Sequence, residues 1–440
     1  ASGSVDISTA GSYTITYTAT DAAGNVGTAT RTVNVVDTIA PTFVSVAATD
    51  GTYKVGDIID ITVTYNEVVS VTGTPTLTLS NGATATYTSG SGTTALVFRY
   101  TVVEGDTNSL DLSVSSYTGV ITDVAGNTAG AASGDLGAVI VDANSPTFVS
   151  VAATDGTYKV GDIIDITVTY NEVVSVTGTP TLTLSNGATA TYTSGSGTTA
   201  LVFRYTVVEG DTNSLDLSVS SYTGVITDVA GNTAGAASGD LGAVIVDANS
   251  PVITVTSGTD TVSPGSSWTD AGATADGGET VTASGTVDTS TVGTYTITYT
   301  ATDASGNVGT ATRTVTVELA VGDPYQGGIV FWLDGNGGGL IVAPADQTSP
   351  ATFTSAIAMC ANLTIGTYSD WFLPSKNQLN QMYLNRAAIG GYAASEHWCS
   401  TAYDLAYGWT QHFGDCTNCS GYKAYYNKVY TFSVRAVRAF

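Results

Sequence analysis

Residues 1–317 repeat short segments in which apolar positions alternate with Thr, Tyr or Ser. Examples are ITVTY, TLTLS, ALVFRYTV and SYTITYTAT. Because side chains along a strand point alternately to opposite faces, this period of two predicts half-buried β-strands. Clusters of Gly, Asn, Asp and Pro, such as TDGTY, SNGAT and EGDTN, separate the segments and predict turns. Many short strands with turns between them are typical of a Greek-key β-sandwich.

Internal repeats divide this β region into modules. Residues 41–145 recur without substitution as residues 146–250. A shorter module, residues 251–317, ends in GTYTITYTATDASGNVGTATRTVTV, and the chain begins with a near-copy of that ending. We therefore interpret residues 1–37 as the C-terminal half of a truncated module and expect the chain to be a fragment of a longer repeat array. Such an array is expected to be a rod-like spacer.

The ending TATDxxGNxG of the shorter module, and of its partial copy, is similar to bacterial Ig-like repeats of large surface adhesins. The resemblance extends over residues 1–317. It implies tandem Ig-like Greek-key β-sandwiches on an extracellular protein of the bacterial surface, and a mainly β fold class.

The pattern changes near residue 318. GGIVFWLDGNGGGLIVAP predicts an apolar hairpin around residues 334–337, and a helix is expected at about residues 352–363. Strands and aromatic-rich loops are expected after residue 396. Residues 322–440 should therefore form an α+β domain rather than a sandwich.

A second helix is predicted to begin after Ser375. Ser375 and Gln378 have the spacing of a capping box, in which each side chain bonds to the other residue's backbone N–H. Gly390 and Gly391 are expected to end this helix.

Four motifs of this last region occur in the order found in the Lcl C-terminal domain family, which is named after a bacterial collagen-like adhesin. They are GGIVFWLD, DWFLPSKNQL, a W-x-S-T segment and the closing VRAVRAF. This resemblance implies a C-type-lectin-like fold that binds a cell-surface or polysaccharide target. The family's usual YWSST is His397-Trp398-Cys399-Ser400-Thr401 here. The calcium-lectin signatures Glu-Pro-Asn, Gln-Pro-Asp and Trp-Asn-Asp are absent, so a calcium-dependent sugar mechanism is not predicted.

The candidate ligand-binding residues lie in an aromatic-rich segment at about residues 403–430. Aromatic and cationic side chains are frequent in recognition surfaces. Trp398 and Trp409 have an alternative role as core residues, which we favour for Trp398, and we expect most of the tyrosines to be exposed. The candidates are Tyr403, Tyr407, Trp409, His412, Tyr422, Lys423, Tyr425, Tyr426 and Lys428.

The charge is strongly acidic and unevenly distributed. The chain has 12 Lys and Arg against 37 Asp and Glu, a net charge of −25. Residues 1–317 hold 29 acids and 6 bases (net −23), whereas residues 318–440 hold 8 and 6 (net −2). An acidic surface repels nucleic acid, so we expect no nucleic-acid partner. No apolar run reaches the roughly 20 residues of a membrane helix, so no membrane span is expected.

One carboxylate stands at each boundary between modules. The boundary residues are Asp37, Asp142 and Asp247, each followed four positions later by Pro. The turns at Asp50 and Asp155 could face the same ends. A structural calcium ion shared between modules, which takes about six to eight oxygen ligands, would stiffen the array. The alternative is a Pro-stiffened linker with a solvated Asp. No organic cofactor is indicated.

A second carboxylate motif, D-x-x-G-N, occurs in every module. We interpret it as a turn in which the Asp side chain caps the backbone and Gly supplies a positive φ angle. A role in calcium binding is the alternative. The motif begins at Asp21, Asp123, Asp228 and Asp303.

All four cysteines lie in the C-terminal region. An even number in one small domain suits an oxidising exterior, and two disulfides are the favoured interpretation. Among the three connectivities we lean towards Cys360–Cys399 with Cys416–Cys419. A zinc site is less favoured because only one closely spaced ligand pair is present.

The leading functional hypothesis is an extracellular adhesin or adhesive appendage subunit in which the modules space a C-terminal recognition domain. The alternative is a structural subunit of a filament or hook whose C-terminal domain mediates homo-oligomerisation. A phage tail-fibre protein is less favoured. Formylglycine-generating oxidases share a related fold, but no nucleophile–base pair or dense carboxylate cluster is evident, so an enzyme is not expected.

Overall fold

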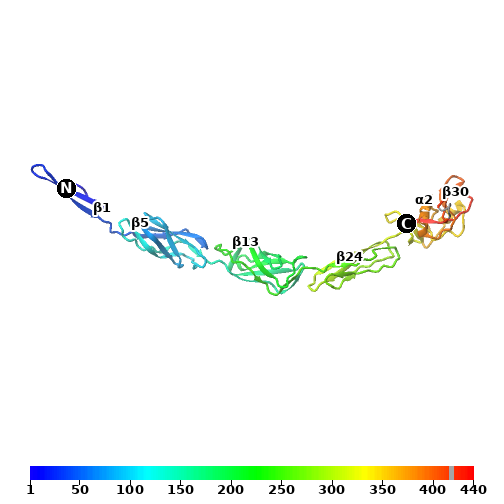
Figure 1. The fold of residues 1–440 in the computed structure, drawn as a ribbon, viewed down its shortest axis with the longest axis horizontal. Helices are drawn as coiled ribbons and strands as arrows, with labels where there is room; N and C mark the ends of the chain where they lie inside the picture. The colour runs from blue at the N-terminus through cyan, green and yellow to red at the C-terminus, as the bar shows by residue number, and fades with distance from the viewer. Residues whose placement is uncertain (416–420) are drawn as a thin grey trace. The chain divides into compact units, whose positions relative to one another are not determined.

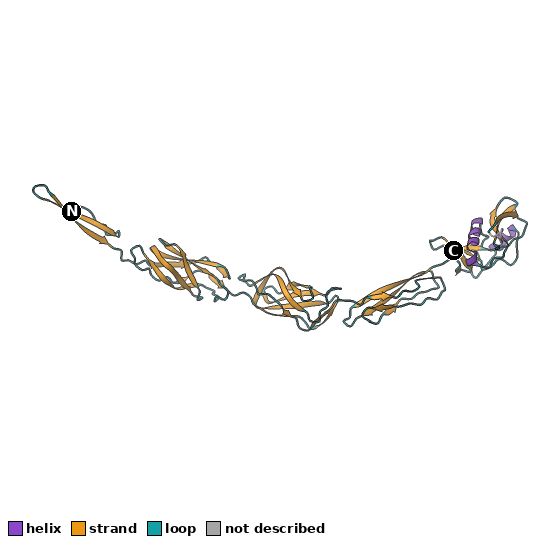
Figure 2. Cartoon of the chain, in the orientation of Figure 1, coloured by secondary structure: helices purple, strands orange, loops and turns teal. Residues whose placement is uncertain are grey.

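The computed structural model describes residues 1–415 and 421–440. The described chain is mainly β, as predicted, and its helices all follow residue 350 (Figures 1 and 2). It divides into two compact units, Ala1–Asn249 and Ser250–Phe440. Of the helices in these described ranges, none has both the length and the apolar content needed to cross a membrane.

The first unit begins with an antiparallel hairpin of β1 (Gly11–Thr20) and β2 (Val26–Val35). The turn between them follows the predicted motif. The Asp21 carboxylate accepts a hydrogen bond of 2.8 Å from the Asn25 backbone, and Gly24 has a φ of 88°.

Residues 41–145 form one antiparallel sheet with the strand order β6-β7-β5-β8-β9, in which β3 also pairs with β5. The first half of the 22-residue β5 pairs with β7 and its second half with β8. A separate pair, β4 and β10, is parallel. The strands are β3 (Phe43–Ala47), β4 (Gly51–Lys54), β5 (Ile58–Leu79), β6 (Thr84–Ser89), β7 (Thr93–Thr101), β8 (Ser113–Thr122), β9 (Gly134–Asp135) and β10 (Val139–Asp142).

Residues 146–250 repeat this topology, as their identical sequence requires. The corresponding strands are β11 (Phe148–Ala152), β12 (Gly156–Lys159), β13 (Ile163–Leu184), β14 (Thr189–Ser194), β15 (Thr198–Thr206), β16 (Ser218–Thr227), β17 (Gly239–Asp240) and β18 (Val244–Asp247).

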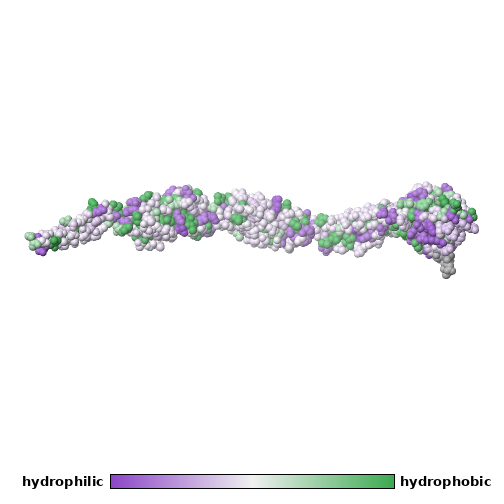
Figure 3. Space-filling model, turned by 90° about the horizontal axis from the view of Figure 1, so that it is seen from above, coloured by the Kyte–Doolittle hydropathy of each residue, from purple (hydrophilic) through white to green (hydrophobic). Residues whose placement is uncertain are grey.

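Each of these modules has its own core. In β5 the predicted alternation is visible, because Ile59, Ile61 and Val63 are buried whereas Asp60 is exposed. The equivalent positions of β13 belong to a second, separate cluster. On the face drawn in Figure 3 the module surfaces are largely pale, which reflects Thr, Ser, Gly and Ala rather than charged residues. Burial of the alternate apolar residues is the main stabilising term.

The linkers that enter the two modules are fixed by matching hydrogen bonds. The Pro41 carbonyl accepts from the Gly130 N–H at 2.9 Å, and the Pro146 carbonyl accepts from the Gly235 N–H at 2.8 Å. The residue after each proline donates its N–H to an Asn side chain on the long strand, at 2.7 Å in both modules. These bonds hold the preceding Asp residues close to the body of each module.

The second unit opens with a smaller module whose main sheet has the order β20-β24-β23-β22, beside a β19–β21 pair. Arg313 of β24 is buried among these strands and bonds to Asp260, to the Tyr299 hydroxyl and to the Thr256 carbonyl. The strands are β19 (Ile253–Val255), β20 (Thr261–Val262), β21 (Ala273–Ala275), β22 (Thr282–Ser284), β23 (Gly293–Thr302) and β24 (Val308–Val317).

The described residues of the C-terminal region combine two small sheets with three helices. The sheet β25-β26-β27-β31 contains the predicted hairpin at Asp334, and the sheet β28-β29-β30 carries most of the aromatic candidates. The elements are β25 (Pro324–Tyr325), β26 (Gly328–Leu333), β27 (Gly339–Val342), α1 (Phe353–Ala361), α2 (Lys376–Leu384), α3 (Arg386–Ile389), β28 (Glu396–Ala402), β29 (Tyr407–His412), β30 (Lys423–Asn427) and β31 (Val437–Ala439).

The helices begin where the sequence predicted. Thr352 caps α1, and both bonds of the Ser375–Gln378 capping box are present at the start of α2. The prediction that α2 continues to Gly390 is wrong. Asn385 ends α2 and donates its side-chain amide to the Phe331 carbonyl at 2.9 Å, after which only the short α3 reaches Gly390.

Candidate functional site

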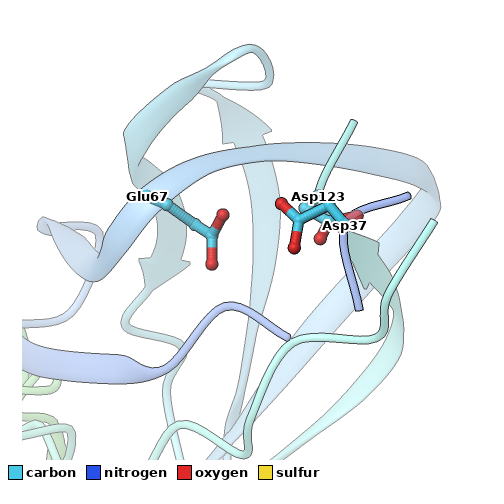
Figure 4. A group of neighbouring side chains, drawn as sticks. All are labelled: Asp37, Glu67 and Asp123. Carbon is cyan, nitrogen blue, oxygen red and sulfur yellow. The ribbon is translucent and has the colours of Figure 1, made fainter. Parts of the chain in front are cut away.

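Three carboxylates converge where the N-terminal hairpin meets the first complete module. One oxygen from each of Asp37, Glu67 and Asp123 lies within 4.8 Å of the others (Figure 4). Asp123 is buried and the other two are half-buried. They line a surface hollow of about 400 Å³ that Ala10 and Gly11 also border.

Each carboxylate comes from a different part of the chain. Asp37 belongs to the linker after β2, Glu67 to the long strand β5, and Asp123 to the turn directly after β8. Asn127 joins two of them, because its amide donates to the Asp123 carboxylate at 2.7 Å and to the Asp37 backbone carbonyl at 3.0 Å. The hydrogen bond from Asn127 lowers the pKa of Asp123, so this group stays ionised at neutral pH.

The corresponding carboxylates 105 positions later are Asp142, Glu172 and Asp228, although among the described residues only the first triad brings its oxygens within 4.8 Å of one another. Burial raises the pKa of Glu172, and the nearby carboxylates of Asp142, Asp228 and Glu104 raise it further. Asn232 again donates to the Asp142 carbonyl and to the Asp228 carboxylate, at 3.0 and 2.8 Å. Because neighbouring like charges disfavour ionisation, a cation would relieve the repulsion at Glu172.

Among the residues predicted for calcium, Asp37 and Asp142 lie in these groups, but the structure does not bring Asp50 or Asp155 to them. The Asp50 carboxylate instead accepts the Ala138 N–H at 2.9 Å, and Asp155 makes the equivalent bond. Asp247, the last residue of β18, accepts a hydrogen bond of 2.8 Å from Asn213.

The motif at Asp123 and Asp228 forms the turn that the sequence predicted, with positive φ at its glycines. Its carboxylates also reach the module boundary, which the turn interpretation did not anticipate. Glu67 and Glu172 were missed altogether. The available signal was the pair Asn-Glu, which interrupts the alternating pattern of VTYNEVVSV.

Four of the predicted ligand-binding residues form a continuous cluster, here called the aromatic surface: Tyr403, Tyr407, Trp409 and Tyr425. The rings of Tyr403 and Tyr425 are stacked, with centroids 4.1 Å apart and an interplanar angle of 4°. Trp409 meets both edge-on, at 5.5 and 5.6 Å, and Tyr407 meets Tyr425 at 5.9 Å. Tyr403 is 51% exposed and Tyr425 48%.

The sheet register explains this cluster. Trp409 of β29 stands opposite Tyr425 of β30, and Tyr407 lies two residues from Trp409 on the same strand. Residues two apart share a face, so the rings gather on one side. The ammonium of Lys376, at the start of α2, lies 3.1 Å from the centre of the Trp409 ring.

The other candidates are placed differently. The ring of Tyr426 packs on Phe432 beside the core. The Lys428 ammonium donates to the carbonyls of Asp404 and Leu405, and the half-buried His412 accepts the Gly414 N–H. Tyr422 and Lys423 are exposed but outside the aromatic surface.

Trp398 is fully buried, as favoured, and donates its indole N–H to the Ala351 carbonyl at 2.8 Å. The predicted disulfide next to it is wrong, because Cys360 and Cys399 are both unpaired. Trp398 shares one core cluster with Cys360, whereas the adjacent Cys399 belongs to another. Neighbouring residues of a strand point to opposite faces, so the Cys399 sulfur is directed away from Cys360.

Burial raises the pKa of the Cys360 thiol to about 12 and also raises that of Cys399. Both are therefore buried thiols rather than reactive ones. Cys416 and Cys419 lie outside the described residues.

The family model described as "Bacterial surface protein, Ig-like domain" matches residues 1–35 and 249–317. This match confirms the bacterial Ig-like prediction for the N-terminal hairpin and the shorter module. Curated protein sequences yield no match to the chain.

Several solved structures are similar to the chain at low scores. An adhesin described as Ca²⁺-stabilised, which helps an Antarctic bacterium to reach out and bind ice, has 20% identity and a TM-score of 0.33, over 70% of this chain and 81% of that one. The titin fragment I67–I69 has 12% identity and a TM-score of 0.29, over 64% and 100%. A 1.5-MDa bacterial ice-binding adhesin has 20% identity and a TM-score of 0.26, over 64% and 98%. TM-scores this low transfer no function to the chain.

Proposed function

We propose that this chain is a non-catalytic, extracellular protein of the bacterial surface, an adhesin or a subunit of an adhesive appendage. Its repeated β modules act as a spacer, and its C-terminal domain binds a cell-surface or polysaccharide target. The family match of residues 1–35 and 249–317 supports the surface assignment. The resemblance of residues 322–440 to the Lcl C-terminal domain supports a recognition role.

The observation that carries the adhesive role is the aromatic surface. Stacked, half-exposed Tyr403 and Tyr425 present polar hydroxyls together with large apolar faces, and such side chains contribute much of the binding energy at recognition surfaces. Their stacking also fixes the rings before a ligand arrives, which reduces the entropy lost on binding.

The test couples the full chain to fluorescent beads and measures their adherence to cells and to immobilised polysaccharides. Replacing Tyr403 and Tyr425 together by Ala should reduce adherence at least tenfold. The matched control replaces Tyr422 and Tyr430, which are exposed tyrosines outside the aromatic surface. Equal adherence of both double variants would contradict the assignment. A stable oligomer that buries Tyr403 and Tyr425 would favour the filament-subunit alternative.

We further propose that Ca²⁺ binds the two carboxylate groups at the module boundaries. Ca²⁺ takes about six to eight oxygen ligands, which three carboxylates and a few waters supply. Asp37 lies in the linker after β2 and Asp142 is the last residue of β10 in the preceding module, whereas Glu67, Asp123 and their copies belong to the modules that follow. An ion held by both sets would restrict bending at the linker and so lengthen the effective reach of the spacer.

A further inference from the structure

A second hollow in the C-terminal domain has the lining of a ligand site. Its volume is about 510 Å³, within the range of roughly 300–1,000 Å³ of small-molecule pockets. It lies between the β26–β27 hairpin and helix α2. Its apolar lining residues are Trp332, Leu340, Ala439 and Phe440, and its polar ones are Asp334, Asn377, Gln378 and Gln381.

Trp332 provides the main apolar wall and is 40% exposed. The register of β26 against β27 shifts between Val330 and Trp332, an irregularity that commonly re-aims a side chain. Phe440 borders the same hollow and is held edge-on by Tyr325, with ring centroids 5.0 Å apart. The exposed indole therefore shares the hollow with an aromatic ring that is held in place.

The polar wall comes from α2 and from the hairpin turn. Asn377 and Gln381 are four residues apart, so they lie on one face of the helix. Within the described part of the chain, neither amide side chain has a hydrogen-bond partner. The Asp334 Oδ1 atom accepts from the N–H groups of Asn336 and Gly338, at 2.7 and 3.0 Å, which orients the carboxylate. Two amides thus supply donors and acceptors, and Asp334 supplies an acceptor.

From this lining we infer that the hollow at Trp332 binds a neutral saccharide unit. A pyranose ring has an apolar face of C–H groups, which matches the indole, and a rim of hydroxyls, which matches amides and a carboxylate. None of the described residues that line the hollow is cationic, and Asp334 is acidic. Electrostatic repulsion therefore disfavours sulfated or sialylated sugars.

This inference goes beyond the proposed function because it assigns a different set of residues from the aromatic surface. Either site can exist without the other. Variants of each site therefore separate the two proposals.

The experiment measures binding of the full chain to immobilised neutral oligosaccharides of glucose, galactose, mannose and N-acetylglucosamine, beside sulfated and sialylated counterparts. Trp332→Ala should weaken binding to a neutral oligosaccharide at least tenfold. The double variant Asn377→Ala/Gln381→Ala changes only the surface of α2 and leaves the apolar wall in place. It should also weaken binding to a neutral oligosaccharide at least tenfold. Leu384→Ala, at an exposed position of α2 outside the hollow, is the matched control and should bind normally.

Circular dichroism establishes that each variant is folded. The inference is overturned if no neutral oligosaccharide binds, if only charged glycans bind, or if the Asn377/Gln381 variant binds like the control. Loss of neutral-sugar binding in the Tyr403/Tyr425 variant alone would also overturn it, while leaving the aromatic surface as the recognition site.

Discussion

The side-chain oxygen of Asn232 accepts a hydrogen bond of 2.8 Å from the backbone N–H of Val55, a residue 177 positions earlier. Val55 follows β4 of the first complete module, and Asn232 lies in the turn after β16 of the second. The same Asn side chain bonds to the carbonyl of Asp142, the last residue of β10, and to Asp228 in its own turn. One buried amide therefore connects the second complete module to the first at two points.

Asn232→Ala should loosen this boundary. Asn232 is 2% exposed, and removing a buried hydrogen-bonding group leaves partners unsatisfied, at a cost of about 1–3 kcal/mol. The free energy of unfolding of the module and the rate of proteolysis within residues 142–146 would measure the effect. Asn25→Ala is the control, because Asn25 occupies the same motif on the exposed hairpin. A similar response of both variants would count against a role at the boundary.

Added Ca²⁺ should raise the melting temperature of residues 41–250, and a chelator should lower it again, because an ion bound only by the folded state stabilises that state. Glu67→Gln combined with Glu172→Gln should remove most of this response. Asp111→Asn, at an exposed carboxylate outside the groups, should keep it. Calorimetry with and without chelator would decide, and an unchanged melting temperature in the wild-type protein would exclude the ion.

Without divalent cations, stability should also depend on pH through Glu172. Its pKa is raised in the folded state, so the folded protein binds this proton more tightly than the unfolded chain does. The resulting stabilisation is present below the ordinary pKa of Glu and is lost as the pH rises through the raised value. In chelator, wild type should lose stability relative to Glu172→Gln between acidic and neutral pH. Denaturation at several pH values would measure the difference, and parallel curves would contradict it.

Arg313→Ala should destabilise the shorter module by about 2–3 kcal/mol, because Arg313 is buried and its loss leaves polar partners unsatisfied. The sequence offers a matched control in Arg31, the equivalent residue of the N-terminal hairpin, which is exposed. Arg31→Ala should have an effect near zero. Chemical denaturation of the two variants would compare them, and equal losses would refute the role assigned to the buried guanidinium.

Local sequence patterns predicted much of the fold. The alternation in ITVTY, the turn at Asp123, the capping box of Ser375 and Gln378, and the burial of Trp398 all match the structure. These features depend on residues within a few positions of each other or on the period of a single strand. The repeat of residues 41–145 likewise required an identical second module.

The candidate sites depend on residues that are distant in the chain. Glu67 meets Asp37 and Asp123 only because the middle of β5, the linker after β2 and the turn after β8 come together. Trp398 and Cys399 are adjacent on β28 and pack on opposite faces, and Trp398 is the one that shares a core cluster with Cys360. Cys399 is therefore separated from Cys360, which removes the expected disulfide. The hollow at Trp332 likewise needs α2 to lie beside the β26–β27 hairpin. The sequence by itself determined the modules, their strands and their turns, because local periodicity specifies them. Only the tertiary structure decided which carboxylates, rings and amides converge, because long-range register and packing set those distances.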